Sequence, residues 1–370
     1  MLALATAAAG CNGSADADGK DDLLPDTSSS ATPSPTPEPQ AVIETNLPEQ
    51  RQRTVPVDTL VELHAEKGTF EKVKVASHKL HVTGELSGDK HTWKATQRLE
   101  PGRTYRVRAV AVDEHGLKTV ERQRFHTDDL TLDEQTYPSF APVDGETVGV
   151  GMPVIIKFDV PVTDRASIEK HLSVETSPHQ AGAFRWISDY EVHWRPKHFW
   201  KPGTDVTVHA DINSVPAGNG IYGQLDRSAT FHIGDSIIAK VFVKKHRMKV
   251  FVNGRLARTV PVSAGKPGFI TRSGTKVIVN KERTKIMDAS TIGIPKSSPE
   301  YYRLKVEYNM RVTYSGEFLH AAPWSTGEQG IANVSHGCVG MSTENARWLY
   351  DLTHGRGDVV KVFGSDRHMT

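Results

Sequence analysis

The sequence predicts a mainly β protein with two β-sandwiches of about 100 residues each, followed by a third β-rich domain that contains a short C-terminal helix. Three observations support this prediction. Long stretches alternate apolar and polar residues with a period of two, which is typical of half-buried strands. A spaced Trp and Pro-Gly pattern occurs twice, and an Asn-Gly dipeptide joins two alternating runs late in the chain. The length of 370 residues is long enough for two or three domains.

Composition and charge exclude several classes of protein. The chain has 45 Lys and Arg residues against 44 Asp and Glu residues, so its net charge of +1 does not draw it to nucleic acid or to an acidic surface. A polyanionic partner would need a local patch of cations. No run approaches the roughly 18 apolar residues that a membrane-spanning helix needs. Two cysteines, Cys11 and Cys338, are too few for a disulfide framework.

Residues 1–11 form a short apolar stretch that is typical of the end of a signal sequence. The last four of them, Ala8-Ala9-Gly10-Cys11, resemble a bacterial lipobox, in which the Cys carries the lipid. We therefore expect an extracytoplasmic lipoprotein that is anchored to the membrane through Cys11. The alternative is an ordinary signal peptide that is cleaved nearby, with Cys11 incidental, and the true start of the signal stays open.

Residues 12–53 are predicted to be a disordered tether. Within them, residues 27–39 contain 11 Ser, Thr or Pro residues out of 13, a composition that cannot bury a core. Such a segment would carry the following domains away from the membrane.

Residues 54–128 and residues 129–235 are predicted to be two immunoglobulin-like domains. Both stretches show the alternating pattern without a helix of useful length, and they share a spaced motif. The motif is Trp93-Lys94, six residues and Pro101-Gly102, and it recurs as Trp194-Arg195, six residues and Pro202-Gly203. An offset of 101 residues between the two copies fits two immunoglobulin-like sandwiches in tandem.

The aromatic residues of these two domains have two interpretations. Exposed groups such as His198 and Trp200 would suit glycan or peptide binding. The interpretation we favour is that Trp93 and Trp194 fill the cores of the sandwiches and that the remaining groups are ordinary surface.

Residues 236–364 are predicted to be a third, β-rich domain, followed by a tail over residues 365–370. Asn253-Gly254 lies between two alternating runs, and it predicts a tight hairpin because both central positions of a type I′ turn need a positive φ. One clear helix is expected before Gly355. Its signals are Ser342 as the cap, Glu344 in the first turn, and the apolar stripe of Ala346, Leu349 and Tyr350.

The densest group of reactive residues lies in this third domain, at His320 and at residues 335–338, which read Ser-His-Gly-Cys. A lone thiol with histidines nearby suggests a thiolate nucleophile. Because a free thiol is mostly protonated at neutral pH, a positively charged His or a helix amino end is needed to populate the anion. Gly337 allows close backbone approach, and the amides of Gly337 and Cys338 could face a developing oxyanion. This pattern suits acyl transfer at a carbonyl.

Two other interpretations of these residues remain. Cys338 could be a small buried apolar residue, with His320 and His336 as two of the 17 histidines in the chain. A zinc site of His320, His336 and Cys338 lacks the paired spacings of structural zinc and a nearby carboxylate, so we predict no metal.

The spacing of His320, fourteen residues and Ser335-His336-Gly337-Cys338 closely resembles the signature of the L,D-transpeptidase catalytic domain, the YkuD-like family. The resemblance extends from Ser236 to about Phe363. It includes Thr271-Arg272-Ser273-Gly274-Thr275, which is similar to a turn of the family, and Met287-Asp288-Ala289-Ser290-Thr291, which leads into a lid. With the two preceding immunoglobulin-like repeats, the chain is similar to the actinobacterial, mycobacterial-type members.

The resemblance implies an enzyme of cell wall biogenesis that forms 3→3 cross-links in peptidoglycan. Cys338 would attack the L-centre carbonyl of diaminopimelate in a donor tetrapeptide stem and expel D-Ala, giving a thioester that an amine of a second stem resolves. His320, oriented by a backbone carbonyl, would be the general base and acid. His336 would line the site and hold its shape. The resemblance implies no cofactor, and it makes carbapenems expected covalent inhibitors.

Further positions carry over from the family as substrate-binding residues. Met287 and Tyr302 would belong to the lid, although both could instead only fill the core. Trp324 would border the cleft, and Ser335 would hold the motif loop. The sequence departs from the family at two further positions, Gly340, where many members have Asn, and Ile292, where relatives often have Tyr.

Two other functions stay open at this stage. The chain could be an inactive cell-wall binding or scaffold lipoprotein, an alternative that Gly340 keeps open. It could also be a Cys-dependent hydrolase, or an acyltransferase that uses a different acceptor.

Overall fold

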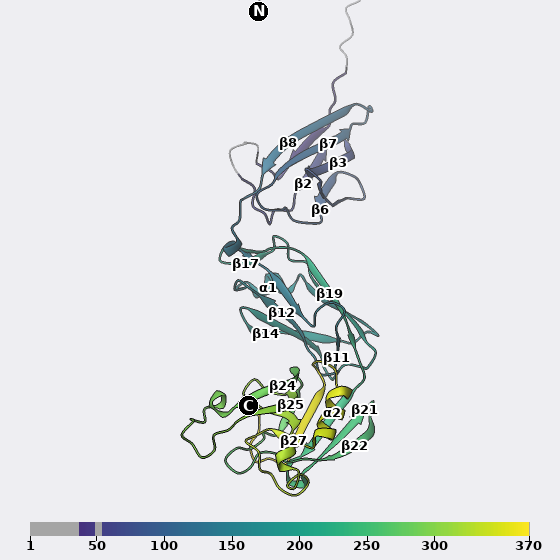
Figure 1. The fold of residues 1–370 in the computed structure, drawn as a ribbon. Coiled ribbons are helices and arrows are strands. Elements are labelled where there is room, and N and C mark those ends of the chain that lie inside the picture. The colour runs from purple at the N-terminus through teal and green to yellow at the C-terminus, as the bar shows by residue number, and fades with distance from the viewer. Residues whose placement is uncertain (1–36, 49–53, 370) are drawn as a thin grey trace, which may run out of the picture. The chain divides into compact units, whose positions relative to one another are not determined.

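The computed structural model describes residues 37–48 and 54–369, and the described chain is mostly strand (Figure 1). The predicted signal segment and lipidation site at Cys11 lie outside the described residues, as does most of the predicted tether. No helix within the described part of the chain is long and apolar enough to span a membrane.

The predicted end of the tether at residue 53 is wrong. Residues Val42–Thr45 form strand β1, which pairs antiparallel with β2 (Glu62–Glu66). Ala41 and Leu47, on either side of β1, are both buried in the core of the first pair of sheets. The few apolar residues after the Pro-rich run therefore give this segment a core to join, which the composition of the run itself does not reveal.

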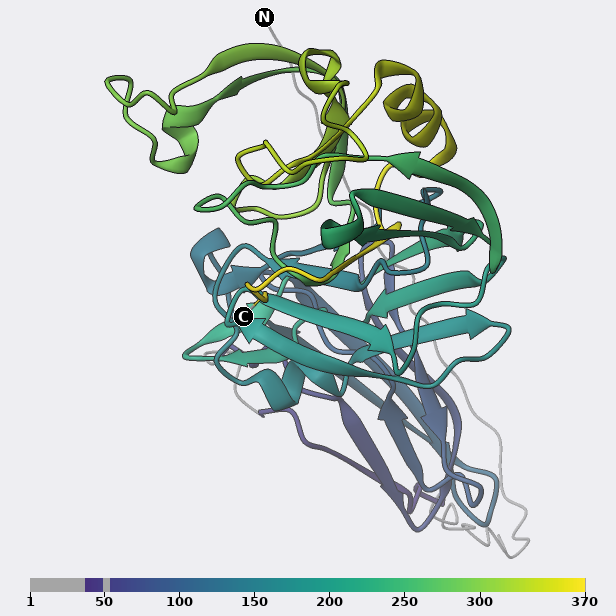
Figure 2. The same ribbon diagram turned by 90° about the horizontal axis from the view of Figure 1, so that it is seen from below.

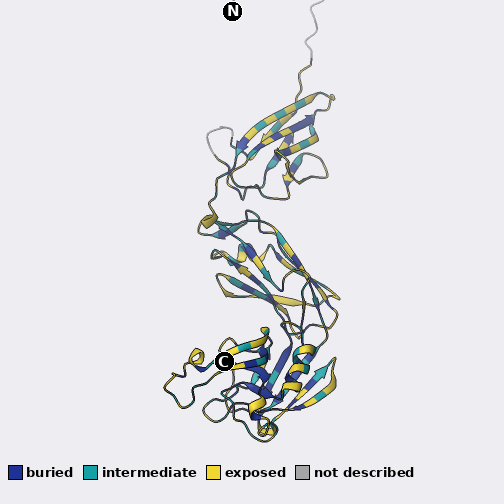
Figure 3. Ribbon diagram, viewed as in Figure 1, coloured by how far each residue is buried: buried dark blue, intermediate teal, exposed yellow. Residues whose placement is uncertain are grey.

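Two four-stranded sheets enclose the first core. Their strand orders are β1-β2-β6-β5 and β4-β3-β7-β8. The remaining strands are β3 (Thr69–Ser77), β4 (Leu80–Val82), β5 (Gly84–Leu86), β6 (Thr92–Ala95), β7 (Thr104–Val112) and β8 (Lys118–His126). Trp93 is buried in this core, as predicted. Buried and exposed residues alternate along β7, as expected for a sheet with one face on a core (Figure 3).

Three sheets form the second part, with strand orders β10-β12-β15-β14, β11-β19-β16-β13 and β17-β18-β9. The strands are β9 (Gln135–Thr136), β10 (Pro138–Ala141), β11 (Thr147–Val148), β12 (Val154–Phe158), β13 (Leu172–Ser177), β14 (Gly182–Ser188), β15 (Glu191–Pro196), β16 (Asp205–Ala210), β17 (Pro216–Gly218), β18 (Ile221–Gly223) and β19 (Arg227–Ile233). Short helical turns are η1 (Leu132–Glu134) and α1 (Arg165–Glu169).

Trp194 fills the second core as predicted, but Trp200 is not an exposed group. Trp200 is buried, its ring stacks on Trp194 with 5.4 Å between ring centroids, and its Nε1 donates to the carbonyl of Met152 at 2.6 Å. A glycan-binding role for Trp200 is therefore excluded by burial. The sequence pattern missed this because Trp200 lies in a loop, where no periodicity reveals which way a side chain points.

Two sheets and one helix form the C-terminal part. The sheet orders are β22-β21-β20-β28-β23 and β24-β25-β26-β27. Their strands are β20 (Ile237–Phe242), β21 (Arg247–Val252), β22 (Arg255–Pro261), β23 (Gly274–Val277), β24 (Asn280–Asp288), β25 (Arg303–Arg311), β26 (Phe318–Ala321), β27 (Val339–Met341) and β28 (Val359–Phe363). The helix is α2 (Thr343–Leu352), and short turns are η2 (Val243–Lys245), η3 (Ala289–Ile292) and η4 (Pro323–Ser325).

Local signals in the third domain predicted its hairpin and its helix correctly. Asn253 and Gly254 both have positive φ values, 47° and 80°, between β21 and β22. Ser342 caps α2 by accepting a hydrogen bond from the amide of Asn345 at 3.3 Å, and Ala346 and Leu349 are buried on its inner face. The predicted fold class, two immunoglobulin-like sandwiches followed by a β-rich catalytic domain with a C-terminal helix, is confirmed.

Candidate active site

A cavity of about 280 Å³ brings most of the predicted site residues together. Eight of the nine predicted catalytic and substrate-binding residues line it: Met287, Tyr302, His320, Trp324, Ser335, His336, Cys338 and Gly340. Gly337 lies between two lining residues without lining the cavity itself. Sequence reasoning did not identify the other lining residues, which are Ser263, Leu304, Val306, Ala322, Ser325 and Val334. Trp324 and Val334 are exposed, at 57% and 39%, so the cavity reaches the surface beside them.

Adjacent parallel strands place His320 beside Cys338. His320 lies in β26 and pairs with Gly340 of β27, while Leu319 pairs with Val339. Cys338 immediately precedes β27, so its side chain lies on the same face as His320, one strand across. The fourteen residues between His320 and Ser335 bring the chain back to the strand next to β26. The linear sequence motif does not show that His320 and Cys338 become neighbours in this way.

Hydrogen bonds from Ser335 and Thr271 hold the loop before Cys338. The Ser335 hydroxyl donates to the carbonyl of Cys338 at 2.6 Å and accepts from the amide of Gly337 at 3.2 Å. Thr271 Oγ1 donates to the carbonyl of Gly337 at 2.8 Å. Gly337 has a φ of 114°, a conformation that side chains rarely adopt, so a glycine is needed there.

The amide of Gly337 differs from our expectation. We expected the amides of Gly337 and Cys338 to face a developing oxyanion. Because the Gly337 N–H already donates to the Ser335 hydroxyl, it serves the loop rather than the cavity. The residue types suggested that the Gly337 amide faces an oxyanion. The direction of its N–H bond in the folded loop decides otherwise.

The geometry of His320 fixes its tautomer. Nδ1 lies 2.7 Å from the carbonyl oxygen of Ala321, which can only accept, so Nδ1 carries the proton and Nε2 is the free basic atom. The ring also stacks on Trp324, with 6.0 Å between ring centroids. Burial lowers the pKa of His320, and the hydrogen bond to Ala321 opposes that shift only in part. The imidazole is therefore neutral at neutral pH.

Burial favours the neutral form of the Cys338 thiol. Burial raises the pKa of Cys338 to about 11. The backbone contact with Phe318 and the nearby cations lower this pKa, but their effect is smaller than that of burial. Sγ donates to the carbonyl of Gly316 at 3.7 Å. We expected a positively charged His or a helix amino end to populate the thiolate in advance, and this expectation is wrong for the free protein. Burial surrounds the thiol with apolar groups. It therefore deprives the thiolate anion of the water that would stabilise it.

His336 is held by the lid segment between β24 and β25. Its Nε2 lies 2.7 Å from Glu300 Oε2, and the same carboxylate oxygen accepts from Lys266 Nζ at 2.6 Å. The ring centroids of Phe269 and Tyr302 lie 4.6 and 5.0 Å from the ring centroid of His336. The sequence contained no signal for Glu300, because the contact joins two residues 36 positions apart and depends on how the hairpin that carries Glu300 folds back. Figure 2 shows this hairpin, in green, extending away from its sheet.

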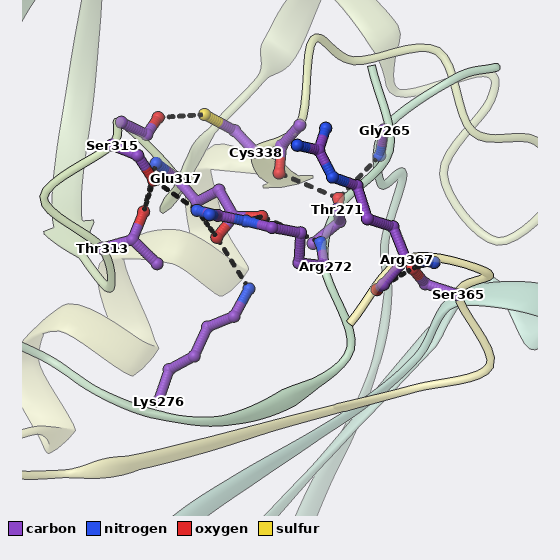
Figure 4. A network of polar contacts seen from close by, with 12 residues as sticks. Gly265, Thr271, Arg272, Lys276, Thr313, Ser315, Glu317, Cys338, Ser365 and Arg367 are labelled. Atoms are coloured by element: carbon purple, nitrogen blue, oxygen red, sulfur yellow. Dashed lines mark hydrogen bonds and ion pairs between the residues drawn. The ribbon is translucent and has the colours of Figure 1, made fainter. Parts of the chain in front are cut away.

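A buried cluster of charges supports the other side of the thiol (Figure 4). Glu317 Oε2 accepts from Lys276 Nζ at 2.8 Å and from Arg272 Nη2 at 3.0 Å. The Lys276 side chain is fully buried and that of Glu317 is 9% exposed. Burial opposes ionisation of Glu317, but the hydrogen bonds from Arg272 and Lys276 outweigh it, so the pKa of Glu317 lies below its ordinary value. The cluster fixes the segment that carries the Gly316 carbonyl. The sequence did not predict it.

Replacing Glu317 with Gln should destabilise the protein strongly. The change leaves the Lys276 ammonium buried without a counter-charge, and breaking one partner of a buried pair typically removes about 3–5 kcal/mol from the free energy of unfolding. Urea unfolding followed by circular dichroism measures this loss.

The matched control is Glu307→Gln on β25. Glu307 pairs with Arg283 at 3.4 Å with both side chains about half exposed, so its loss should remove less than about 1 kcal/mol. Equal, small changes in both variants would contradict a structural role for the buried cluster.

Gly340 leaves no room for a side chain such as that of Asn. A Cβ on Gly340 would lie 2.8 Å from the Cβ of Ala322, closer than side chains approach one another. Ala322 is buried against the same cavity. The absence of a side chain at position 340 therefore makes room for the methyl group of Ala322. Gly340 thus has a packing role of its own and does more than remove an amide group from the cavity.

Gly340→Asn should lower both stability and reactivity. Overpacking at a buried site costs about 1–3 kcal/mol in stability, and the displaced Ala322 follows directly after the carbonyl that orients His320. The rate of covalent reaction with a carbapenem, followed by intact-protein mass spectrometry, and the melting temperature are the measurements. The double variant Ala322→Gly with Gly340→Asn should recover most of the lost stability. If Gly340→Asn melts at the wild-type temperature, the steric argument fails.

Within residues 37–48 and 54–369, no group of three His, Cys, Asp or Glu side chains is placed to hold a metal ion.

Comparisons with known proteins place the chain in a family. The model of the L,D-transpeptidase catalytic domain (YkuD) matches residues 236–362, and a model of a bacterial Ig domain matches residues 52–216. L,D-transpeptidase 2 of Mycobacterium tuberculosis is 40% identical over 309 residues, which are 83% of this chain and 75% of that protein.

Solved structures agree with these matches. The structure of LD transpeptidase LdtMt1 in complex with imipenem is 38% identical, with a TM-score of 0.54, and the match covers 62% of this chain and 99% of that one. L,D-transpeptidase 3 from Mycobacterium tuberculosis, in complex with a faropenem-derived adduct, is 31% identical with a TM-score of 0.52, over 63% of this chain and 100% of that one. The chain belongs to the L,D-transpeptidase family, and it is similar to L,D-transpeptidases of Mycobacterium tuberculosis.

Proposed function

We propose that this protein forms 3→3 cross-links between peptidoglycan stem peptides through a thioester on Cys338. The observation that carries the proposal is that His320 of β26 and Cys338, which immediately precedes the adjacent parallel strand β27, line one cavity, with Nδ1 of His320 bound to a carbonyl. This arrangement leaves Nε2 of a neutral imidazole free to act as a base in a cavity that the thiol also lines.

The first half-reaction is acylation by the donor tetrapeptide. His320 Nε2 takes the proton of the thiol as Sγ attacks the L-centre carbonyl of diaminopimelate, and the C–N bond to the terminal D-Ala breaks. The imidazolium returns the proton to the leaving amine. Because burial favours the neutral thiol, proton transfer accompanies the attack on bound substrate instead of preceding it.

The second half-reaction is attack by an amine of a second stem on the thioester. His320 accepts a proton from that amine, the C–S bond breaks, and the proton passes to the sulfur, so the neutral pair is restored. Water in place of the amine would give hydrolysis. The energy of the cleaved amide is retained in the thioester and then in the new amide, so the proposal involves no cofactor.

The remaining site residues have supporting roles in this proposal. His336, tied to Glu300, joins the lid to the motif loop, while Ser335 and Gly337 hold that loop. Met287 and Tyr302 contact the donor stem from the lid side, and Trp324 borders the entrance. Gly340 gives the cavity its shape beside Ala322.

The rest of the chain would deliver this site to the wall. We propose that the chain from β1 to residue 128 and residues 129–235 act as two immunoglobulin-like modules, that residues 236–364 are catalytic, and that Cys11 anchors the chain as an extracytoplasmic lipoprotein. Carbapenems are proposed as covalent inhibitors, because relatives of this chain were solved in complex with imipenem and with a faropenem-derived adduct.

Incubation of the purified chain with a disaccharide-tetrapeptide, followed by mass spectrometry of the products, tests the proposal. A cross-linked dimer with one D-Ala released per link is the expected result. Tripeptide without dimer, even with added stem amine, would instead indicate a hydrolase. Neither product, together with no carbapenem adduct on Cys338, would indicate an inactive scaffold and overturn the proposal.

A further inference from the structure

The first pair of sheets carries a groove lined by cations, far along the chain from the catalytic residues. On β7, Tyr105 and Val107 are buried in the core while Arg106 and Arg108 are exposed on the opposite face. A hollow of about 1000 Å³ lies over that outer face. Its cations, which we call the cationic groove, are Lys74, Lys79, Arg103, Arg106, Arg108 and Arg124, and no Asp or Glu lines it.

The strand register sets like charges directly opposite one another. In one row across the sheet, Lys74 of β3 pairs with Arg108 of β7, which pairs with Arg122 of β8. In the next row, Arg106 of β7 pairs with Arg124 of β8. Directly opposed side chains of an antiparallel pair have Cβ atoms only about 4.5–5.5 Å apart, and like charges there destabilise the sheet.

The cations of the groove have no close carboxylate partner in the described part of the chain. Among the described residues, none of the six cations of the groove forms an ion pair with a carboxylate. Elsewhere on the same two sheets, cations are paired, as Lys94 is with Glu62 at 3.3 Å and Lys118 with Glu71 at 2.6 Å. The repulsion is therefore local to the groove, although the chain as a whole is nearly neutral, with a net charge of +1. An anionic ligand would relieve it.

We propose that the cationic groove binds a linear phosphodiester polymer of the cell envelope. Arg forks and Lys ammonium groups are the side chains that recognise phosphate oxygens. A stem peptide of peptidoglycan fits less well, because its free amines would meet cations and no carboxylate. A membrane surface also fits less well, because the cations line a hollow, where a chain can lie, instead of a flat face.

Binding of a fluorescent poly(glycerol phosphate) chain to the full-length protein tests this proposal. The double variant Arg106→Gln with Arg108→Gln should bind at least tenfold more weakly than the wild type. Its plot of log affinity against log salt should be shallower by roughly 1.4, since each lost phosphate contact removes about 0.7 from the slope. Its melting temperature should equal or exceed that of the wild type, because the repulsion across the rows is relieved.

The matched control removes two cations that are already paired on the same sheets, Lys94→Gln with Lys118→Gln. It changes the net charge by the same amount, and it should bind within about twofold of the wild type. Equal weakening in both double variants would assign the effect to net charge and overturn the proposal. Absence of binding by the wild type, or tighter binding to phosphatidylglycerol vesicles or to soluble peptidoglycan fragments than to the polymer, would overturn it as well.

Discussion

Cys338→Ala is expected to abolish covalent reaction with a carbapenem and the formation of stem dimers, while the protein stays folded. The variant loses the only atom in the cavity that can form a thioester, so activity should fall by several orders of magnitude to the background of the assay. The side chain packs in a small buried cluster with Met287, Val306 and Phe318. Removing one sulfur from this cluster should reduce the free energy of unfolding by about 1 kcal/mol.

Intact-protein mass spectrometry after carbapenem exposure, alongside a thermal melt, separates these two effects. Cys338→Ser is the matched control, because it keeps a polar atom of similar size but not the thiol chemistry, and it should also form no dimer. An adduct of the expected mass on the Ala variant would show that another residue is acylated. The proposed function would then fail at its first step.

His320→Gln is expected to slow acylation by about 10²–10⁴-fold, the range of general acid–base catalysis. Gln can still donate to the carbonyl of Ala321 but offers no basic nitrogen to the thiol. Because burial raises the pKa of Cys338 to about 11, the acylation rate of the variant should depend on the small fraction of thiolate that is present before substrate binds. Its rate should therefore rise with pH up to about 11, whereas the wild-type rate should level off at a much lower pH.

The lowered pKa of His320 predicts how the acylation rate and the stability change as the pH falls. Because the pKa of His320 is lowered from 6.5 on folding, the wild-type enzyme should keep its base neutral and active below pH 6.5. The folded state binds fewer protons there than the unfolded chain, so this residue's contribution to stability is fully present above pH 6.5 and is lost as the pH falls toward the lower folded pKa. Stopped-flow acylation rates from pH 5 to 10 measure the profile.

His336→Gln is the control for His320→Gln, because it removes an imidazole from the same cavity but one that contacts Glu300. It should change the KM for the donor stem and the stability of the lid, and leave the acid limb of the kcat profile in place. If His336→Gln removes the acid limb and His320→Gln does not, the two histidines have exchanged roles.

Local patterns predicted a large part of this structure. The Asn253-Gly254 turn, the Ser342 cap and the alternating strands depend on neighbours within a few residues, so short-range chemistry determines them. The two buried tryptophans of the repeated motif followed from their periodicity, because a large apolar group in a half-buried strand has one favourable side. The motif around Cys338 and the family resemblance identified eight of the residues that line one cavity.

Other features were out of reach of any local pattern. The tether was predicted to continue through residue 53, but Val42–Thr45 is a strand because β2 offers it partners 18 to 24 residues later. Trp200 looked like a surface group until its packing on Trp194 was known. Expecting a thiolate at Cys338 was an error of the same kind, because motif chemistry contains no information on burial.

Residue types and spacing were sufficient to assign a mainly β chain, its late hairpin and helix, and the reactive thiol and imidazole, since each is encoded within a short window. The charge state of that thiol, the Glu317 and Glu300 contacts that support the site, and the opposed cations of the groove required the folded molecule. Each depends on side chains brought together from distant positions, and at such short range desolvation and Coulomb forces decide which protonation states and which contacts persist.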